Sequence, residues 1–460
     1  MRKVEAAMNQ AERDAREKII SAFYRAMTTH MAPLDPSKDA NLYVENLHFD
    51  PQRDQVKQLA RAIRDTGGSE VFYFTGQRGT GKSTELRRLK GLLEKTGACV
   101  FYADMIDYVP ETEPVEIGDF LITLMGAWSD AIGPGAGGTR ESYWTRIRGF
   151  LGSEVKWSEF GLKVGGEGLG AEVKFALKEN PSFKRLIQRA AADRLQAVVS
   201  DARAFMTDTV TSLRNEVPPD VPIVFIVDSL ERLRGVSPDA MNDMFRHVVT
   251  LFESHRDNLR LPGVSVVYSV PPYLGFLSNV KSTGRLFSLA SVRVFERRTA
   301  EGGGGRRESG LAKMRELVER RFPQWREVLQ AAALDELAAH SGGDLREYFI
   351  RFMQACLSRA YEYLEDLPLT AEHAAIQETI AEARSDYRRA VFGEDLPLLA
   401  KVYDDQDIAL DTRAVELTAI ARMFDIRAVL SYRNGDEWYD VHPLLQPAIA
   451  EYERSNQRQR

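Results

Sequence analysis

Residues 76–83 constrain the fold of this chain more than any other segment. They match the pattern G-x-x-x-x-G-K-[ST], in which a glycine-rich turn presents a nest of backbone N–H donors to a polyphosphate. A β-branched and aromatic run, Val71–Thr75, precedes the turn, and a segment with Leu86, Leu89 and Leu93 at helical spacing follows it. Strand, loop and helix in this order direct the helix N-terminus at the phosphates, so the chain is predicted to bind a nucleotide.

Two side chains of this loop have defined chemical roles. Lys82 is expected to reach the β- and γ-phosphates, and the Ser83 hydroxyl is expected to ligate Mg²⁺. The expected cofactors are therefore a nucleoside triphosphate and Mg²⁺. The residues predicted to bind the nucleotide in this segment are Gly76, Gln77, Arg78, Gly79, Thr80, Gly81, Lys82, Ser83 and Thr84.

Composition narrows the class of protein. A length of 460 residues predicts two or three domains. The net charge of −6 argues against a surface that is basic overall, although it is compatible with a local basic patch. Cys99 and Cys356 are isolated in apolar surroundings, which predicts neither a zinc site nor a disulfide scaffold. The charged N-terminus and the lack of a long apolar run predict a cytoplasmic protein without a membrane partner.

Further apolar runs predict an α/β fold with a parallel sheet that is covered on both faces. The strands expected after Val71–Thr75 are Ala98–Asp104, Ile223–Asp228, Val264–Val270 and a fainter Leu289–Phe295. Helical patterns cover residues 1–30, Arg53–Thr66 and Lys313 to about Arg384.

The connection at 105–222 is far longer than one crossover helix requires. It is predicted to contain an apolar helix at Ile117–Ile132 and a long returning helix at Ser182–Glu216. Between them, Glu154–Val164 and Ala171–Leu177 alternate in polarity around a glycine-rich stretch, which indicates a β-hairpin.

The expected organisation therefore has four parts. Residues 1–50 form an N-terminal helix and lead-in, and residues 51–300 form the phosphate-loop core with the insertion at 105–222. Residues 301–390 form a helical region, and residues 391–460 a small α+β unit. That unit ends in a hairpin at Ala428–Val441, where Asn434-Gly435 favours a type I′ turn.

The strand Ile223–Asp228 supplies the second anchor of the site. The apolar run that ends in Asp228 places a carboxylate where it can hold the Mg²⁺ shell. Glu231 can orient water on the γ-phosphate if the chain turns sharply after the strand; otherwise it is a surface residue of a following helix. Asp104, at the end of the second strand, is a reserve candidate for this base.

Four further residues are candidates for the site. Ser269, at a strand end, can bond attacking water or simply end the strand. Arg285, placed just before the fifth strand, can serve a neighbouring subunit as an arginine finger or be a surface residue. Arg346 follows the break Ser341-Gly342-Gly343 and can sense the γ-phosphate. His442 can sense nucleotide or be a buried capping residue.

Together these motifs resemble the additional-strand P-loop ATPases, near the boundary of the AAA+ and STAND groups, over about residues 40–104 and 220–445. The resemblance implies ATP as the nucleotide, sheet order 5-1-4-3-2, a helical lid and a C-terminal winged helix. It also implies that ATP binding rather than fast turnover is the working event.

The chain departs from that pattern at three positions. Ser229 stands where many relatives have a catalytic glutamate, which leaves the rate of hydrolysis open. Ser269 is not followed by the arginine that many STAND proteins carry. His442 resembles the winged-helix histidine that contacts ADP in apoptosome-like relatives, but Pro443 stands where they have aspartate.

Two functions follow as hypotheses. The first is a regulatory ATPase that changes conformation or oligomeric state to control an effector protein, in a setting such as bacterial antiviral defence or signalling. The second is a DNA-associated AAA+ ATPase that uses the winged helix, or the Arg297-Arg298 and Arg306-Arg307 pairs, on nucleic acid. A kinase ranks below both. A GTPase is disfavoured because no Asn-Lys-x-Asp motif occurs.

Overall fold

The structure is a computed structural model that describes residues 8–29, 32–133, 142–151, 169–233, 238–277, 280, 284–299, 302–408 and 414–459. The chain divides into two compact units. The sheet unit comprises Gln55–Arg78 and Glu85–Ser288, and the helical unit comprises Met1–Asp54, Gly79–Thr84 and Leu289–Arg460. The division into four domains stays a prediction. No helix in the described ranges is both long and apolar enough to span a membrane.

The sheet unit is built on five strands in the order β2-β3-β4-β1-β5, which confirms the expected order. Strands β1, β3 and β4 are buried along their whole length, as their unbroken apolar sequences predict. The pairs β1–β4, β2–β3 and β3–β4 are parallel. The strands are β1 (Val71–Gly76), β2 (Cys99–Asp104), β3 (Ile223–Asp228), β4 (Ser265–Val270) and β5 (Arg285–Leu289).

The fifth strand lies earlier than expected. Strand β5 ends at Leu289, where the predicted strand Leu289–Phe295 was to begin. The apolar residues after Leu289 are buried for another reason, because they pack within the helical unit: the Val292 N–H donates to the Gly343 carbonyl at 3.1 Å. Because the segment is buried, its apolar sequence resembles that of a strand, although it forms none of the five strands of the sheet.

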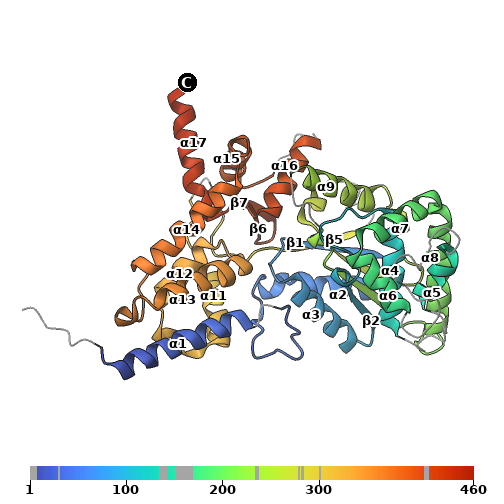
Figure 1. Cartoon of the computed structure of the whole chain (residues 1–460), viewed down its shortest axis with the longest axis horizontal. Helices are drawn as coiled ribbons and strands as arrows, with labels where there is room; N and C mark the ends of the chain where they lie inside the picture. Colours follow the sequence, from blue (N-terminus) through green and yellow to red (C-terminus); the bar gives the residue numbers. More distant parts are fainter. Residues whose placement is uncertain are drawn as a thin grey trace, which may run out of the picture. The chain divides into compact units, whose positions relative to one another are not determined.

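Helices flank the sheet. Helix α2 (Gln55–Asp65) precedes β1, α3 (Lys82–Lys95) follows the phosphate loop, and α9 (Pro238–Glu253) joins β3 to β4. In the described part of the insertion between β2 and β3, the regular elements are helices (Figure 1). Its helices are α4 (Ile117–Ile132), α5 (Tyr143–Leu151), α6 (Leu169–Glu179), α7 (Pro181–Asp193) and α8 (Leu195–Leu213).

The predicted hairpin in the insertion is wrong where it can be checked. Residues Ala171–Leu177 belong to helix α6, and Glu154–Val164 lie outside the described residues. The buried side chains are Val173, Ala176 and Leu177, at helical spacing, whereas Phe175 is 67% exposed. In a strand, Phe175 would lie on the same face as Val173 and Leu177 and would be buried with them. The alternation of polarity in this segment is therefore a chance pattern, and the predicted strand is wrong. The long returning helix is also two helices, which meet at Arg194 (φ −127°).

The insertion is anchored to the sheet by Trp128 of α4. Its indole lies edge-on to Phe101 of β2 and Phe225 of β3, with ring centroids 5.0 and 5.2 Å apart. Its Nε1 donates to the Thr209 hydroxyl of α8 at 3.0 Å, so the one polar atom of a fully buried side chain is paired.

The helical unit contains the N-terminal helix, a helical bundle and the C-terminal segment. Helix α1 (Gln10–Thr29) buries Ile20, Phe23 and Met27, and Phe23 stacks on Phe322 with centroids 4.8 Å apart. The bundle confirms the helical pattern of the sequence. It contains α11 (Glu308–Arg321), α12 (Ala331–His340), the π-helix η9 (Glu347–Met353), α13 (Gln354–Ala360) and α14 (Ala374–Ala390).

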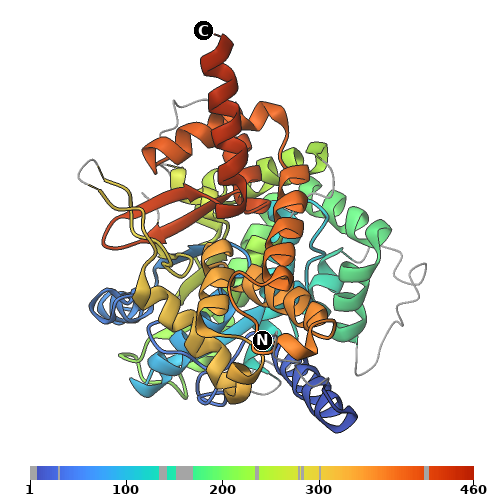
Figure 2. The same ribbon diagram turned by 90° about the vertical axis from the view of Figure 1, so that its left-hand side faces the viewer.

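The C-terminal segment contains α15 (Leu396–Asp405), α16 (Ala414–Asp425), an antiparallel hairpin and α17 (Gln446–Gln459) (Figure 2). The hairpin strands β6 (Val429–Arg433) and β7 (Glu437–Val441) confirm the predicted pairing. The type I′ turn is wrong, because Arg433 pairs with Glu437 across a three-residue loop in which only Gly435 has positive φ (114°). The winged-helix assignment of this segment stays a prediction.

Candidate functional site

The first half of the phosphate loop lies at the carboxyl edge of the sheet. Parallel strands bring their carboxyl ends to one edge, and the register places Asp104 opposite Asp228 and Ser269 opposite Phe74. The loop leaves β1 at Gly76 on this edge. Predicted site residues from four segments of the sequence are thus brought together by the sheet.

Asp228 is fully buried and held in a fixed orientation. One carboxylate oxygen accepts a hydrogen bond from the Ser229 N–H at 2.7 Å, and the other accepts one from the Tyr102 hydroxyl. Burial and the neighbouring Asp228 charge raise the pKa of Tyr102 well above its ordinary value, so this hydroxyl remains a donor. Carboxylate oxygens are ligands of Mg²⁺ and its water shell in proteins, so Asp228 is of the residue type that such a site requires.

Glu231 reaches the site because the chain turns sharply after Asp228. Ser229 adopts the left-handed conformation (φ 70°), and the short helix η5 (Leu230–Arg232) follows. The half-buried Glu231 carboxylate accepts a hydrogen bond from the Ser269 hydroxyl at 2.6 Å. The two polar candidates therefore form one pair, and Glu231 is not an exposed residue of a regular helix.

The remaining candidates of the sheet unit are placed differently. The reserve candidate Asp104 accepts a hydrogen bond from the Ile106 N–H at 3.2 Å and so caps the turn after β2. Arg78 of the loop pairs with Glu111 at 3.2 Å. Arg285 is the exposed first residue of the edge strand β5, in the strand rather than before it.

The second half of the loop, Gly79–Thr84, belongs to the helical unit. Gly79 and Gly81 have φ of 92° and 95°, a conformation that favours glycine and turns successive N–H groups toward one side. Lys82 and Ser83 begin helix α3 and are buried. The Thr84 hydroxyl accepts a hydrogen bond from the Leu34 N–H at 3.0 Å, so the lead-in to the core is tied to the loop.

Arg346 packs directly on this half of the loop. A Cβ added to Gly79 would lie 2.7 Å from the Arg346 Cβ and 3.3 Å from its Cδ. Arg346 is nonetheless an exposed residue, so its stem covers Gly79 while much of its surface remains accessible. Leu345 and His48 approach Gly81, each with an atom 3.8 Å from the position of an added Cβ.

His442 lies deep in the helical unit. Its ring is fully buried and stacks on Tyr387 with centroids 4.3 Å apart, and its Nδ1 accepts a hydrogen bond from the Leu444 N–H at 3.3 Å. Burial, reinforced by the charges of Arg427, His340 and Arg351, lowers its pKa to about 3. The capping alternative is therefore realised, and direct contact with nucleotide stays a prediction.

Three contributors were missed by sequence reasoning. Tyr102 orients Asp228, Glu111 pairs with Arg78, and His48 approaches Gly81. Tyr102 faces Asp228 only because β2 and β3 are neighbours in register, which no local signal in the sequence reveals.

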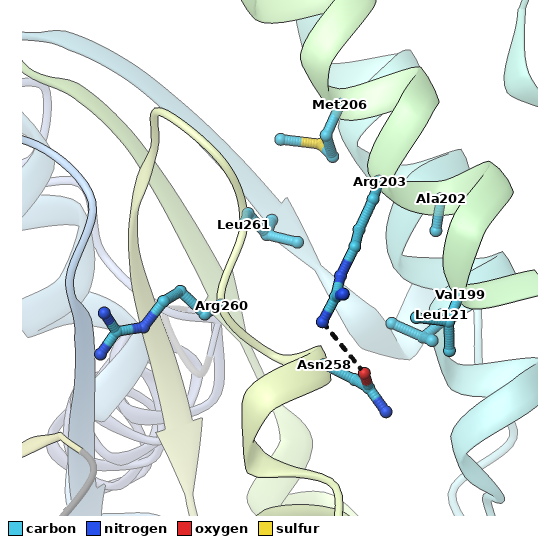
Figure 3. Close-up of a pocket in the computed structure, with 8 residues that line it drawn as sticks. All are labelled: Leu121, Val199, Ala202, Arg203, Met206, Asn258, Arg260 and Leu261. Atoms are coloured by element: carbon cyan, nitrogen blue, oxygen red, sulfur yellow. Dashed lines mark hydrogen bonds between the residues drawn. The ribbon is translucent and has the colours of Figure 1, made fainter. Parts of the chain in front are cut away.

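A small cavity elsewhere in the sheet unit is not a ligand site. Figure 3 shows Arg203 of α8 directed toward Asn258, to which its Nη2 donates at 3.4 Å. The cavity between α4, α8 and the segment before β4 has a volume of about 10 Å³, enough for roughly one water molecule.

Comparisons with known proteins give structural likenesses only. No family model and no curated protein matches the chain. Among solved structures, Cdc6p from Pyrobaculum aerophilum is 14% identical, with a TM-score of 0.35 over 91% of this chain and 98% of that one. The Aeropyrum pernix ORC2 protein, solved as ADPNP–ADP complexes, is 13% identical, with a TM-score of 0.34 over 89% and 98% of the two chains.

The structure of Drosophila ORC bound to poly(dA/dT) DNA and Cdc6 matches with 10% identity and a TM-score of 0.31. That match covers 92% of this chain and 54% of the other. All three TM-scores are too low to carry an argument about activity. The strand order and the phosphate loop themselves establish the fold class, a parallel α/β sheet of the P-loop type.

Proposed function

We propose that this protein is an ATP-binding, slowly hydrolysing regulatory ATPase of the AAA+/STAND type, which switches conformation or oligomeric state to control a partner protein. The observation that carries the proposal is the packing of Arg346 on Gly79 of the phosphate loop. An arginine at this position can contact the γ-phosphate and so distinguish ATP from ADP. The setting in bacterial defence or signalling follows from the family resemblance alone.

The residues fit ATP and Mg²⁺. In the helical unit, the left-handed glycines would supply the N–H cradle, Lys82 the phosphate charge and Ser83 a metal ligand. In the sheet unit, Asp228 would be the carboxylate for the metal and its water shell. Mg²⁺ would offset the negative charge that develops on the phosphates. The Ser269 hydroxyl holds Glu231 by a short hydrogen bond to its carboxylate, which keeps that carboxylate directed and able to orient a water molecule.

The test compares binding of ADP with binding of a non-hydrolysable ATP analogue by calorimetry. Lys82→Ala is expected to weaken both nucleotides, because it removes a charge that both contact. Arg346→Ala is expected to weaken the analogue roughly tenfold and ADP much less, the size of one charge-assisted hydrogen bond. Arg389→Ala, which removes a 77% exposed side chain, serves as the control. Equal weakening of both nucleotides by Arg346→Ala would contradict γ-phosphate sensing.

A second candidate function, nucleic-acid association, is favoured by a basic groove in the helical unit. Two adjoining cavities of about 310 and 520 Å³ share Asp50, Pro51 and Arg293. Their basic lining residues are Arg53, Arg293, Arg307, Lys313 and Arg433, and the acidic one is Asp50. A groove of this kind can follow a chain of phosphates.

The Arg297–Arg307 loop is a weaker candidate than the groove. Arg298 forms a bidentate pair with Asp440, with both distances 3.0 Å, and Arg306 pairs with Glu336 at 2.6 Å. Figure 2 shows the ribbon before α11 beside the β6–β7 hairpin, where the Arg298 pair joins them. The Arg298 and Arg306 side chains are therefore already paired with carboxylates of the protein itself.

The groove predicts substitutions of opposite sign. Arg293→Ala should weaken binding of duplex DNA and lower its salt dependence by about one phosphate contact. Asp50→Asn should strengthen binding, because Asp50 lies 3.4 Å from Arg307 and 3.9 Å from Arg293 and competes for both. Fluorescence anisotropy at several salt concentrations measures both effects. Identical DNA affinities for the unmodified protein, Arg293→Ala and Asp50→Asn would exclude this groove as the DNA-binding site.

A further inference from the structure

A buried ion-pair cluster lies beside Arg346 and has no role in the site described above. Asp344 and Glu347 flank Arg346 in the sequence, and their side chains are 0% and 4% exposed. Both pair with Arg427, whose Nε lies 3.4 Å from Asp344 Oδ2 and whose Nη1 lies 3.6 Å from Glu347 Oε2. One guanidinium thus joins the residues on both sides of Arg346.

Arg427 comes from the C-terminal segment and occupies an unusual backbone position. Helix α16 ends in a Schellman motif, in which the Arg427 N–H donates to the Phe424 carbonyl and the Ala428 N–H to the Met423 carbonyl. The residue after the helix in this motif is left-handed and is usually glycine; here it is Arg427, with φ of 59°. A side chain at this position costs about 1 kcal/mol relative to glycine. In this chain the position is occupied by an arginine in spite of that cost, and the arginine side chain makes two buried ion pairs.

The cluster also holds the backbone that presents Arg346. The Asp344 carboxylate accepts a hydrogen bond from the Glu347 N–H at 2.9 Å and so caps the helical turn that begins at Leu345 and continues into the π-helix η9. Because Arg346 lies between these two residues, the orientation of its stem over Gly79 depends on the cap. π-helical turns occur frequently at functional sites.

A second path connects the C-terminal segment to the same carboxylate. The Tyr387 hydroxyl donates to Glu347 at 3.2 Å, and Tyr387 stacks on His442. The His442 N–H donates to the carbonyl of Ala428, the residue after Arg427, at 2.8 Å. Arg427 and His442 are therefore joined within the C-terminal segment, and both are linked to Glu347, Arg427 directly and His442 through Tyr387.

We propose that Arg427 is a positioning residue that acts through Asp344 and Glu347 to hold Arg346 on the phosphate loop, and so couples the C-terminal segment to the state of the bound nucleotide. This inference rests on the proposed function, since it requires that Arg346 senses the γ-phosphate. Movement of the C-terminal segment would withdraw the guanidinium, release the cap and change the preference for ATP over ADP.

The measured quantity is the ratio of the affinities for the ATP analogue and for ADP. Arg427→Gly relieves the backbone strain and removes the guanidinium; it is expected to change the ratio by roughly five- to tenfold, the size of a typical coupling between sites. Arg427→Lys keeps a charge and should retain part of the ratio. Arg359→Met is the matched control, because Arg359 also joins two carboxylates of the helical unit, Glu378 and Glu382, away from Arg346.

A double-mutant cycle separates positioning from general loosening of the fold. If Arg427 acts through Arg346, the protein with both Arg427→Gly and Arg346→Ala will have the ratio of Arg346→Ala alone. A purely structural role would instead weaken both nucleotides equally and add to the effect of Arg346→Ala. Arg427→Gly leaves the buried Asp344 carboxylate without its ion-pair partner, while Glu347 keeps Arg351 at 2.8 Å. Arg427→Gly with Glu347→Gln therefore provides a second variant in which one of the two buried carboxylate charges is removed.

The outcomes also distinguish this inference from the proposed function. A changed ratio in Arg346→Ala with an unchanged ratio in both Arg427→Gly proteins would overturn the inference and leave the nucleotide sensor intact. An unchanged ratio in Arg346→Ala would overturn both. The inference is supported if Arg427→Gly changes the ratio and its effect is not additive with that of Arg346→Ala.

Discussion

At the scale of single residues, the environment decides the chemistry. Ser269 and Glu231 were separate candidates in the sequence and form one hydrogen-bonded pair in the structure. His442 and Glu347 lie in one buried cluster, yet burial acts on them in opposite directions. It lowers the pKa of His442 to about 3, and it raises the pKa of Glu347 to about 7, an effect that Arg351 partly offsets.

These two shifts predict opposing pH dependences of stability. For His442 the neutral form is favoured in the folded state, so its contribution is present above pH 6.5 and is lost as the pH falls toward 3. For Glu347 the protonated form is favoured, so its contribution is present below pH 4.5 and is lost as the pH rises through 7. Each changes stability by about 1.4 kcal/mol per pH unit between its two values.

Between pH 5 and 6.5 the two contributions should nearly cancel in the unmodified protein. His442→Gln should therefore become more stable as the pH falls through this interval, and Glu347→Gln less stable. Denaturant unfolding at several pH values measures both slopes. Parallel slopes in the two variants would show that one of these groups is not buried in solution as described.

At the scale of elements, errors arose where local pattern and tertiary environment disagreed. The sequence predicts a strand at helix α6 because the polarity of this segment alternates by chance. It also predicts a strand after Leu289 because the segment there is apolar and buried, although β5 ends at Leu289. Helix α4 shows the opposite case, since its apolar sequence correctly indicated burial. Gly126 on α4 lies against Trp144 so closely that an added Cβ would be 2.1 Å from the indole. The requirement for glycine at this position depends on Trp144 of α5, and the residues around Gly126 in the sequence do not reveal it.

At the scale of the whole molecule, the proposed switch predicts a change in assembly. If the switch acts through self-assembly, the exposed Arg285 on the edge strand β5 would serve a neighbouring subunit as an arginine finger. Light scattering should then show a defined multimer with the ATP analogue and a smaller species with ADP. Lys82→Ala should abolish the change, and Arg285→Ala should weaken it. A mass that does not depend on nucleotide would argue against self-assembly as the output and in favour of a partner protein or DNA.

The sequence by itself determined the features that depend on short-range physics. The phosphate loop, the buried strands, the Asp228 strand end and the hairpin at Asn434-Gly435 all follow from local residue patterns, because glycine conformations and hydrophobic periodicity act within a few residues. The resemblance to additional-strand ATPases supplied the strand order, and the structure confirmed it.

Only the tertiary structure decided which distant residues meet. Tyr102 orients Asp228 because β2 and β3 are adjacent in register, and Arg346 covers Gly79 because the helical bundle returns to the loop. Arg427 reaches Asp344 and Glu347 from a left-handed backbone position that glycine usually occupies. Such contacts join residues far apart in the chain, and their free energy comes from burial and charge pairing that exist only once the elements have packed together.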